Sequence, residues 1–420
     1  MHATEAINGR GRTLTGTTNI DSRASWAIAF TALAIYSVSF GAPYITVVAL
    51  KPIADELGSA RSVPALAFAL AWFGSALGGI AMGWLAEKLG IRWTVIGGAL
   101  MVALGLVLSS LGGQTTLLIG HGLCIGLLGN AGINAPLYVY VSRWFDRRRG
   151  SAMALISSGV YLAGAIWSAP FERAIAIFGW RDTMLIYAAF EIAVVVPAAL
   201  VMLGPAPETA EPAPLPGSAQ ARWVLGLRPW TVQVFLCLAG FLCCVPMAMP
   251  QGHLVAFCSD IGIPATHGAA MLSVLLGCAF LSRQFWGVVT DRIGGLRTVL
   301  AGSVCQITTM IGFLLTQDEA GLFAVAAAFG LGFSGIIPAY VVAIRELFPS
   351  REASWRVPSV LFVSMGGMAV GGWLAGALYD YFGFYGPAFA GGFLFNLVNL
   401  VLVGFLVLRQ RQTGPLPAMA

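Results

Sequence analysis

The sequence predicts an all-α polytopic membrane protein that crosses a bilayer twelve times, in two pseudo-symmetric six-helix bundles. Of its 420 residues, 58% are hydrophobic and only 10% are charged, whereas soluble domains carry about 25% charged residues. The mean hydropathy is +0.83. Apolar runs long enough to span a bilayer recur along the chain and are separated by short charged, Pro or Gly breaks.

The apolar runs divide into twelve segments. They are 24–50, 63–86, 93–111, 116–141, 151–171, 183–203, 230–259, 269–290, 298–316, 321–344, 358–378 and 385–408. The longest connection contains a stiff, Pro-rich stretch and divides the segments six and six. The predicted order is a tail (1–23), a first bundle (24–203), a linker (204–229), a second bundle (230–408) and a tail (409–420).

The basic residues predict the orientation. With the N-terminus inside, the cytoplasmic segments hold 18 Lys and Arg residues and the outer segments hold 4. Because cytoplasmic loops are enriched in Lys and Arg, both tails and the linker are expected in the cytoplasm. The first 23 residues carry no apolar core, so we expect no cleavable signal peptide. Short loops favour a bacterial inner membrane, and the net charge of +5 needs no nucleic-acid partner.

Arg283 is the basic residue that this division leaves inside the membrane. It lies within the apolar run 269–290, eight positions before Asp291, which is about 12 Å along a helix. A fixed charge at that depth costs at least a few kcal/mol, and a guanidinium presents a planar fork to a carboxylate. We therefore expect Arg283 to anchor an anionic substrate. The alternatives are an internal counter-ion and a donor to backbone carbonyls.

One loop motif occurs twice, at matched places in the two halves. The loop after the second segment holds Gly83, Glu87, Lys88, Gly90 and Arg92, and the loop after the eighth holds Gly287, Asp291, Arg292 and Gly294. In both, an acid, a base and a second glycine follow the first glycine by four, five and seven positions. This repetition indicates two related bundles. We expect these residues to shape cytoplasmic turns that change during the conformational cycle.

Twelve segments, a central linker and the duplicated loop motif resemble the major facilitator superfamily over residues 24–408. The resemblance implies two bundles around a central cavity and alternating access. Three shorter motifs are similar to its monocarboxylate transporter branch, which includes oxalate–formate exchangers. They are the basic loop at 143–150, the turn Phe178, Gly179, Trp180 and Arg181, and Arg283 followed by Gly287.

The chain departs from that branch in three places. Animal monocarboxylate transporters have an aspartate one turn before the arginine, where this chain has Ala279. They have a lysine after a proline in the first segment, where Tyr44 follows Pro43. The second intramembrane cation of the oxalate exchanger has no counterpart in 358–378. A single cation favours a monocarboxylate, while the missing aspartate keeps anion exchange open as an alternative to proton symport.

Four further residues are candidates for the substrate site. By the resemblance, Asn130 and Asn134 lie in a cavity-lining span, where amides orient a hydroxyl or carboxylate or, equally, join two helices. Tyr44 and Ser334 are weaker candidates of the same kind.

Two other residues, Asp260 and His253, lie near the outer end of segment 230–259 and are candidates for proton coupling or gating. The alternative for both is a wet helix end. Glu191, inside segment 183–203, is expected to be a protonated or hydrogen-bonded packing residue rather than a functional one.

The predicted function is secondary transport of a small organic anion, a monocarboxylate before others, coupled to protons and carried out by a monomer in the bilayer. We expect no enzyme activity and no cofactor or metal, because no GxSxG, P-loop, HExxH or Cys/His ligand cluster occurs. Three alternatives stay open: an organic-anion exchanger, an exporter of drugs or neutral metabolites in which Arg283 is structural, and a membrane sensor or partner subunit that transports nothing.

Overall fold

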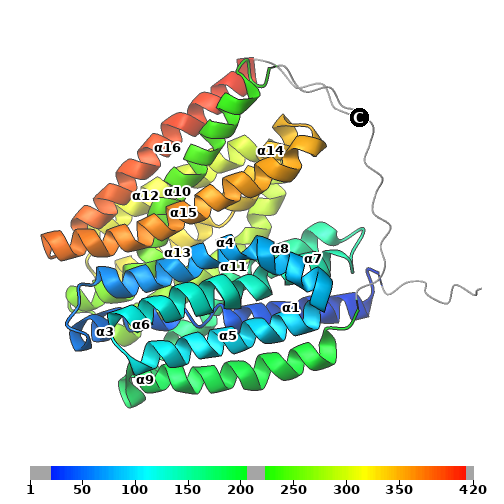
Figure 1. Ribbon diagram of the computed structural model, residues 1–420. Helices are drawn as coiled ribbons and strands as arrows, with labels where there is room; N and C mark the ends of the chain where they lie inside the picture. Colours follow the sequence, from blue (N-terminus) through cyan, green and yellow to red (C-terminus); the bar gives the residue numbers. More distant parts are fainter. Residues whose placement is uncertain (1–19, 206–222, 413–420) are drawn as a thin grey trace, which may run out of the picture.

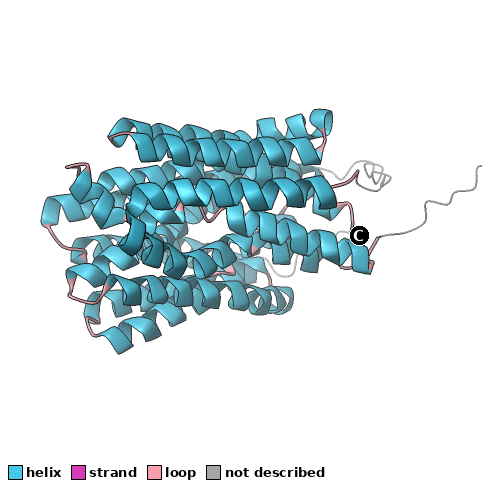
Figure 2. Cartoon of the chain, turned by 90° about the horizontal axis from the view of Figure 1, so that it is seen from below, coloured by secondary structure: helices cyan, strands magenta, loops and turns pink. Residues whose placement is uncertain are grey.

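The structure is a computed structural model that describes residues 20–205 and 223–412. Most of both expected tails and the Pro-rich part of the linker lie outside these ranges. Within them the regular structure is helical, apart from one isolated bridge between Val224 and Leu227. Figures 1 and 2 show long helices lying side by side in two orthogonal views.

We call α1–α9 the N half and α10–α16 the C half. The N half consists of α1 (Arg23–Ser39), α2 (Tyr44–Val48), α3 (Leu50–Glu56), α4 (Ser62–Leu89), α5 (Ile91–Leu111), α6 (Gln114–Ile119), the π-helix η1 (Gly120–Asn130), α7 (Ala131–Ser142), α8 (Arg149–Ser157) and α9 (Gly159–Met202). The C half consists of α10 (Pro229–Asp260), α11 (Ala265–Ile293), α12 (Gly295–Leu315), α13 (Glu319–Phe333), α14 (Ile336–Leu347), α15 (Ser350–Phe382) and α16 (Gly386–Gln412).

Ten helical stretches of the described residues are long and apolar enough to cross a membrane, where the sequence predicts twelve segments. The difference has two local causes. α1 has only 17 residues before the chain breaks, so the first segment is not one long helix. α8 and α9 follow each other without a connecting loop over 54 residues, which contain nearly all of the predicted fifth and sixth segments. Inside α9, Gly179 at φ 78° interrupts the helix.

Three predicted segments are interrupted near their middles. The first breaks between α1 and α2, where Pro43 supplies no N–H group. The fourth contains η1, and the tenth breaks between α13 and α14. Irregular backbone at membrane depth is tolerated where it is covered by protein or lines a cavity. The residues at the first and tenth interruptions, 40–43 and 334–335, are buried, so protein covers the irregular backbone there.

Positive-φ glycines recur with the same spacing in both halves. Gly90 and Gly294 have φ 85° and join α4 to α5 and α11 to α12. Gly179 (φ 78°) follows Gly90 by 89 positions, and Gly383 (φ 81°) follows Gly294 by the same number. A residue with a Cβ adopts this conformation at a cost, whereas glycine does not. The backbone therefore repeats with an offset of 204 residues, as the duplicated loop motif predicts.

The halves meet along two helix pairs, α4 with α15 and α9 with α11. Figure 1 shows α10, α12, α15 and α16 grouped above α1, α5 and α9. Large apolar side chains such as Ile80, Val201 and Leu315 lie exposed on the outside, as expected where lipid replaces water.

We name the two ends of the bundle by one residue each. The Arg61 end carries the α3–α4, α10–α11 and α15–α16 connections, and the Arg92 end carries the α4–α5, α7–α8 and α11–α12 connections. The described chain begins and ends at the Arg92 end (Figure 1).

Candidate functional site

Arg283 lies on α11 where that helix packs against α9 of the other half. Its Nη1 donates to the carbonyl of Ser157 at 3.1 Å. Its Cζ lies 5.2 Å from the centroid of the Tyr161 ring. None of the five ion pairs in the described part of the chain includes Arg283, and its buried Nε has no hydrogen-bond partner there. One edge of the guanidinium is thus free to bind an acceptor.

The contact with Ser157 follows from a local irregularity of the backbone. The chain turns at Ser158, between α8 and α9, and the amide of Tyr161 donates to the Ser158 carbonyl at 3.0 Å. The guanidinium of Arg283 binds the preceding carbonyl. Arg283 therefore crosses from the C half to the N half at membrane depth.

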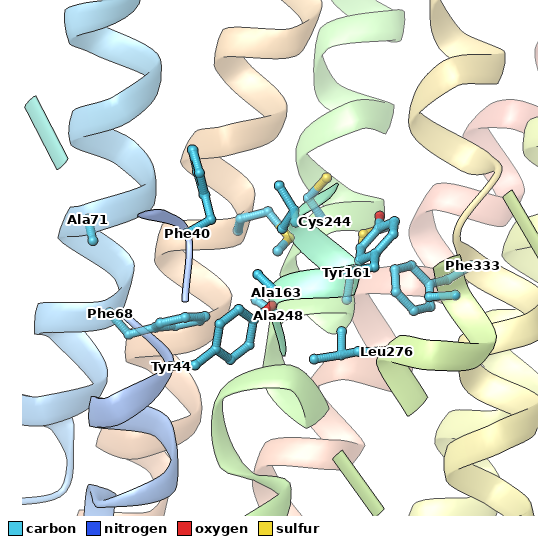
Figure 3. Packing of buried hydrophobic residues seen from close by; sticks show 14 of the residues in the cluster. Phe40, Tyr44, Phe68, Ala71, Tyr161, Ala163, Cys244, Ala248, Leu276 and Phe333 are labelled. Atoms are coloured by element: carbon cyan, nitrogen blue, oxygen red, sulfur yellow. The ribbon is translucent and has the colours of Figure 1, made fainter. Parts of the chain in front are cut away.

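Aromatic side chains surround this contact. The Tyr161 ring packs edge-on against Phe333, with centroids 5.5 Å apart. Tyr36 packs against Gly159 of α9, two positions before Tyr161. Figure 3 shows Tyr161 beside Phe333 and Cys244, with Leu276 below them. In such apolar surroundings an ionic hydrogen bond is stronger than in water, and an unpaired charge is costly.

Tyr44 and Asn130 are buried, and each holds a polar atom without a partner. The Tyr44 hydroxyl and the Asn130 Oδ1 make no hydrogen bond within the described residues. The centroids of the Tyr44 and Phe68 rings are 5.6 Å apart. Figure 3 shows the two rings beside each other. A buried orphan polar atom costs about 1–3 kcal/mol unless something binds it. Both atoms thus lack a partner among the described residues, and their role in substrate binding stays a prediction.

Ser334 and Asn134 differ from these two. The Ser334 hydroxyl lies 2.7 Å from that of Ser282 and is almost fully buried, so it joins α13 to α11. Asn134 is half-buried on α7. Asn130 and Ser334 nevertheless occupy equivalent places, because they are 204 positions apart and each lies where its helix is interrupted.

Asp260 is paired at the Arg61 end and lies far from Arg283. Its carboxylate accepts from both Nη1 and Nη2 of Arg61, the second at 2.8 Å, and lies 3.4 Å from Lys51 Nζ. Arg283 is 18 residues into α11, about 27 Å from the start of that helix. The structure therefore places Asp260 in a contact between the two halves at the Arg61 end rather than beside the guanidinium of Arg283.

His253 lies buried within the same end. Its Nε2 lies 2.7 Å from the Gly372 carbonyl and its Nδ1 lies 3.1 Å from the Tyr385 hydroxyl. The carbonyl can only accept, so Nε2 carries the proton and Nδ1 accepts from Tyr385. Tyr385 also accepts from Arg61 Nη1 at 3.4 Å, which links His253 to the Arg61–Asp260 pair.

Several contacts at this end involve residues that the sequence did not single out. The Asp380 carboxylate accepts from the backbone amides of Arg61 at 2.8 Å and Ser62 at 2.9 Å, so it caps α4 from the other half. Thr266 donates to Glu172 at 3.0 Å across the α9–α11 contact. The sequence signal was weak, because short polar residues at helix ends are common.

The Arg92 end is different. Among the described residues, its polar contacts stay within one half, such as Arg92 Nε to the Leu203 carbonyl at 3.0 Å and Gly295 N–H to the Glu346 carboxylate at 3.0 Å. In the duplicated loop motif, Glu87 and Asp291 are exposed and make no hydrogen bond or ion pair with other described residues. The halves are thus tied together at the Arg61 end, with Arg283–Ser157 as the deepest polar link between them.

No group of three His, Cys, Asp or Glu side chains within 20–205 and 223–412 is placed to hold a metal ion. The chemistry that the arrangement offers is anion binding by a guanidinium and by buried hydroxyl and amide groups.

Sequence comparisons identify the family of the chain. Residues 28–354 match the Major Facilitator Superfamily. A Bos taurus protein named monocarboxylate transporter 13 is 29% identical over 371 residues, covering 85% of this chain and 82% of that protein. The Aspergillus flavus protein named MFS transporter asaE is 27% identical, over 71% of this chain and 66% of that protein.

The fold also matches solved structures. A bacterial homologue of the human lysosomal transporter Spinster, in an inward-facing and unoccupied conformation, superposes with a TM-score of 0.73 at 14% identity, over 94% of this chain and 99% of that chain. The match extends over nearly the whole chain, and the matching families are transporters rather than enzymes. This helical membrane protein is a member of the major facilitator superfamily.

Proposed function

We propose that the chain is a proton-coupled secondary transporter of a small organic monocarboxylate and that Arg283 binds the substrate carboxylate. The observation that carries the proposal is the free edge of a part-buried guanidinium at the contact between the halves. A carboxylate bound there neutralises the charge, which lowers the cost of closing a dry site around it. The name of the Bos taurus relative, a monocarboxylate transporter, supports the same substrate class.

In this proposal the predicted bundles, 24–203 and 230–408, rock about the site and the chain crosses the bilayer twelve times. Segments five and six are the two arms of α9 on either side of Gly179. The Arg92 end faces the cytoplasm, because it holds most of the basic loop residues. Asp260 acts as a gate: its bonds to Arg61 and Lys51 close the outer end while the cytoplasmic end lacks polar bridges among the described residues.

The substrate site would include Tyr44 and Asn130 through their unpartnered polar atoms. Ser334 and Asn134 are assigned supporting roles, Ser334 by holding α13 against α11. The aromatic surroundings of Arg283 favour a small acid with an apolar body. A dicarboxylate is disfavoured, because none of the ion pairs among the described residues places a second cation in this region.

One observation favours a second candidate. Arg283 already donates to a backbone carbonyl, which is the structural role expected of it in an exporter of neutral compounds. Exchange of one anion for another is a variant of the first proposal, since Ala279 supplies no carboxyl beside Arg283.

Uptake by purified protein in liposomes tests these candidates with labelled lactate, pyruvate, acetate, formate and oxalate, with and without an inward proton gradient. Loss of a hydrogen bond to a charged group costs about 1.5–3 kcal/mol, so Arg283→Ala should reduce uptake about 10- to 150-fold. Arg283→Lys keeps the charge and loses the planar fork, and should also fall sharply. The matched control is Arg297→Lys, at an exposed arginine near the Arg92 end.

Three results would decide against the proposal. Uptake that survives Arg283→Lys unchanged would favour a structural arginine. Uptake that depends on internal anion and not on the proton gradient would favour exchange. No uptake of any acid by folded protein would favour the exporter.

A further inference from the structure

The first membrane segment is broken at membrane depth, and side chains of α9 cover the break. Helix α1 ends at Ser39 and α2 begins at Tyr44. The residues between them are buried. A Cβ on Gly41 would overlap the Tyr187 hydroxyl and the Trp167 ring, so the break fits closely against α9.

Three successive residues at the end of α1 are each bound by a side chain of α9. Trp167 Nε1 donates to the Ser37 carbonyl at 3.1 Å, and the Tyr187 hydroxyl donates to the Val38 carbonyl at 2.7 Å. The Ser39 hydroxyl donates to Glu191 Oε1 at 2.6 Å. Interrupting a helix leaves its last carbonyls without amide donors. The bond to Ser37 satisfies such a carbonyl, and the bond to Val38 adds to one from the Gly41 amide at 2.9 Å, but the third engages an ionisable group.

Glu191 is turned into the protein and has no cation beside it. Its exposed fraction is 0%, while its neighbours Phe190 and Ile192 on the lipid side are 36% and 39% exposed. Its second oxygen, Oε2, is buried without a hydrogen-bond partner among the described residues. No described ion pair includes it. An ionised carboxylate in this position would be strongly disfavoured.

The helices packed against α9 do not supply a counter-charge within the described residues. Their charged and titratable groups are Arg23 and Tyr36 on α1, Tyr44 on α2, Arg92 on α5, Arg149 on α8, and His267, Cys278, Arg283, Asp291 and Arg292 on α11. Arg92 is bonded to the Leu203 carbonyl, His267 to Glu319 and Arg283 to the Ser157 carbonyl. On its own helix, Glu191 faces Tyr187 one turn away.

The break also contacts the surroundings of the anion site. Phe40, the first residue of the break, stacks on Tyr36 with ring centroids 4.2 Å apart and an interplanar angle of 4°. A Cβ on Gly159 would lie 3.0 Å from the Tyr36 ring, so Tyr36 packs against α9 between Ser157 and Tyr161, which both contact Arg283. A shift of Phe40 and Tyr36 therefore reaches the residues that hold Arg283.

We propose that Glu191 is the proton-binding site of the transport cycle and that its protonation holds the α1–α2 break in the conformation described here. This inference rests on the proposed proton-coupled function. A proton from one side of the membrane binds the carboxylate, and the neutral carboxyl accepts from Ser39 in the dry position. When the proton leaves to the other side, the carboxylate requires water or new donors, so the Ser39 contact opens. Phe40 and Tyr36 then shift beside Arg283, so the protein holds the anion more weakly after the proton has left than before.

Two assays on Glu191→Gln, which mimics the neutral form, separate coupling from transport itself. With one proton carried per anion, a pH gradient of one unit supports about tenfold accumulation. The wild-type protein should reach this tenfold accumulation of substrate, and Glu191→Gln should accumulate no substrate. The variant should still exchange labelled for unlabelled substrate at equal pH on both sides, because this exchange needs no net proton movement. Its exchange rate should be independent of pH where the wild-type rate is not.

Glu191→Asp keeps a titratable carboxyl and should restore part of the accumulation, which guards against a Gln variant that fails to fold. Ser39→Ala removes one bond and leaves the carboxyl, so it should accumulate substrate with an altered pH profile. Gradient-driven accumulation by Glu191→Gln at the wild-type level would overturn this inference and leave the proposed function standing. Loss of exchange and accumulation in folded Gln and Asp variants would also overturn it, by assigning Glu191 to packing. Absence of proton-driven uptake by the wild type would overturn the proposed function as well.

Discussion

Replacing Asp260 by Asn should shift the protein away from the conformation closed at the Arg61 end. The Asp260 carboxylate accepts both terminal nitrogens of Arg61 and lies 3.4 Å from Lys51. The side chains of Arg61 and Asp260 are 11% and 20% exposed. Arg61 also lies over the Tyr379 ring, with Cζ 3.8 Å from its centroid. These contacts join the two halves and must break if that end opens.

The magnitude follows from the degree of burial. Exposed pairs contribute about 0.2–1 kcal/mol, while removing one partner of a fully buried pair costs about 3–5 kcal/mol. This pair lies between those limits, so we expect about 1–3 kcal/mol. That corresponds to a shift of about 5- to 150-fold in the ratio of the two conformations.

Hydrogen–deuterium exchange by mass spectrometry measures this shift without labels. In Asp260→Asn, peptides from the Arg61 end, such as 57–66 and 376–386, should exchange faster, and peptides from the Arg92 end should exchange more slowly. The matched control is Arg173→Ala, because Arg173 is exposed and makes no hydrogen bond or ion pair with other described residues. Exchanging the two residues, Arg61→Asp with Asp260→Arg, should restore part of the wild-type pattern. Unchanged exchange at both ends in Asp260→Asn would refute the gate.

Three further predictions concern the helix ends. The Arg181 guanidinium lies 2.7 Å from Glu56 and lowers the pKa of that carboxyl. The stability that this ion pair contributes is lost as the pH falls through the lowered pKa. Below about pH 5, the melting temperature should therefore depend on pH more in the wild type than in Glu56→Gln. Asp21 accepts the amides of Arg147 and Arg148 at 2.9 and 3.2 Å, so Asp21→Ala should speed tryptic cleavage at 143–149, and an unchanged cleavage rate would contradict this. Gly294→Ala forces a residue with a Cβ into φ 85° and should lower the stability of the protein by about 1–2 kcal/mol in thermal melts in detergent. The control Gly83→Ala, whose Cβ meets nothing within 4 Å, should leave the stability unchanged.

The sequence was informative where the physics is local. The apolar runs predicted the helices, and the duplicated motif predicted the turns at Gly90 and Gly294, because only glycine adopts that backbone without strain. It also selected Arg283, since a charge inside an apolar run stands out. The break after Ser39 was not predicted, because Gly41 and Pro43 occur in many continuous membrane helices.

Long-range partners were not predictable in the same way. Arg61 and Asp260 are separated by 199 positions, and nothing in the residues near either one specifies the other. Glu191 was expected to be a protonated or hydrogen-bonded packing residue, but its partner Ser39 could not be predicted, because the depth of a residue can be read from the sequence and the face of its helix cannot. The same ambiguity separates buried Asn130 from half-buried Asn134 four positions later.

The offset of 204 residues explains why the gate joins the halves. Glu56 and Asp260 are equivalent by that offset, and so are Arg181 and Tyr385. In the N half, Glu56 pairs with Arg181 of the same half at 2.7 Å. In the C half the arginine is replaced by Tyr385, so Asp260 has no cation of its own at that place and binds Arg61 from the other half.

The same comparison separates scaffold from function. The equivalent of Arg283 is Gly79, and the equivalent of Glu191 is Phe395, so each intramembrane charge occurs in one half only. A duplicated charge in the closed cavity would add a second desolvation cost without a second substrate to offset it. The helices and turns can repeat because they have the same task in both halves. A single anion and a single proton need one site each, and the unduplicated residues Arg283 and Glu191 are therefore where the two proposals should be tested first.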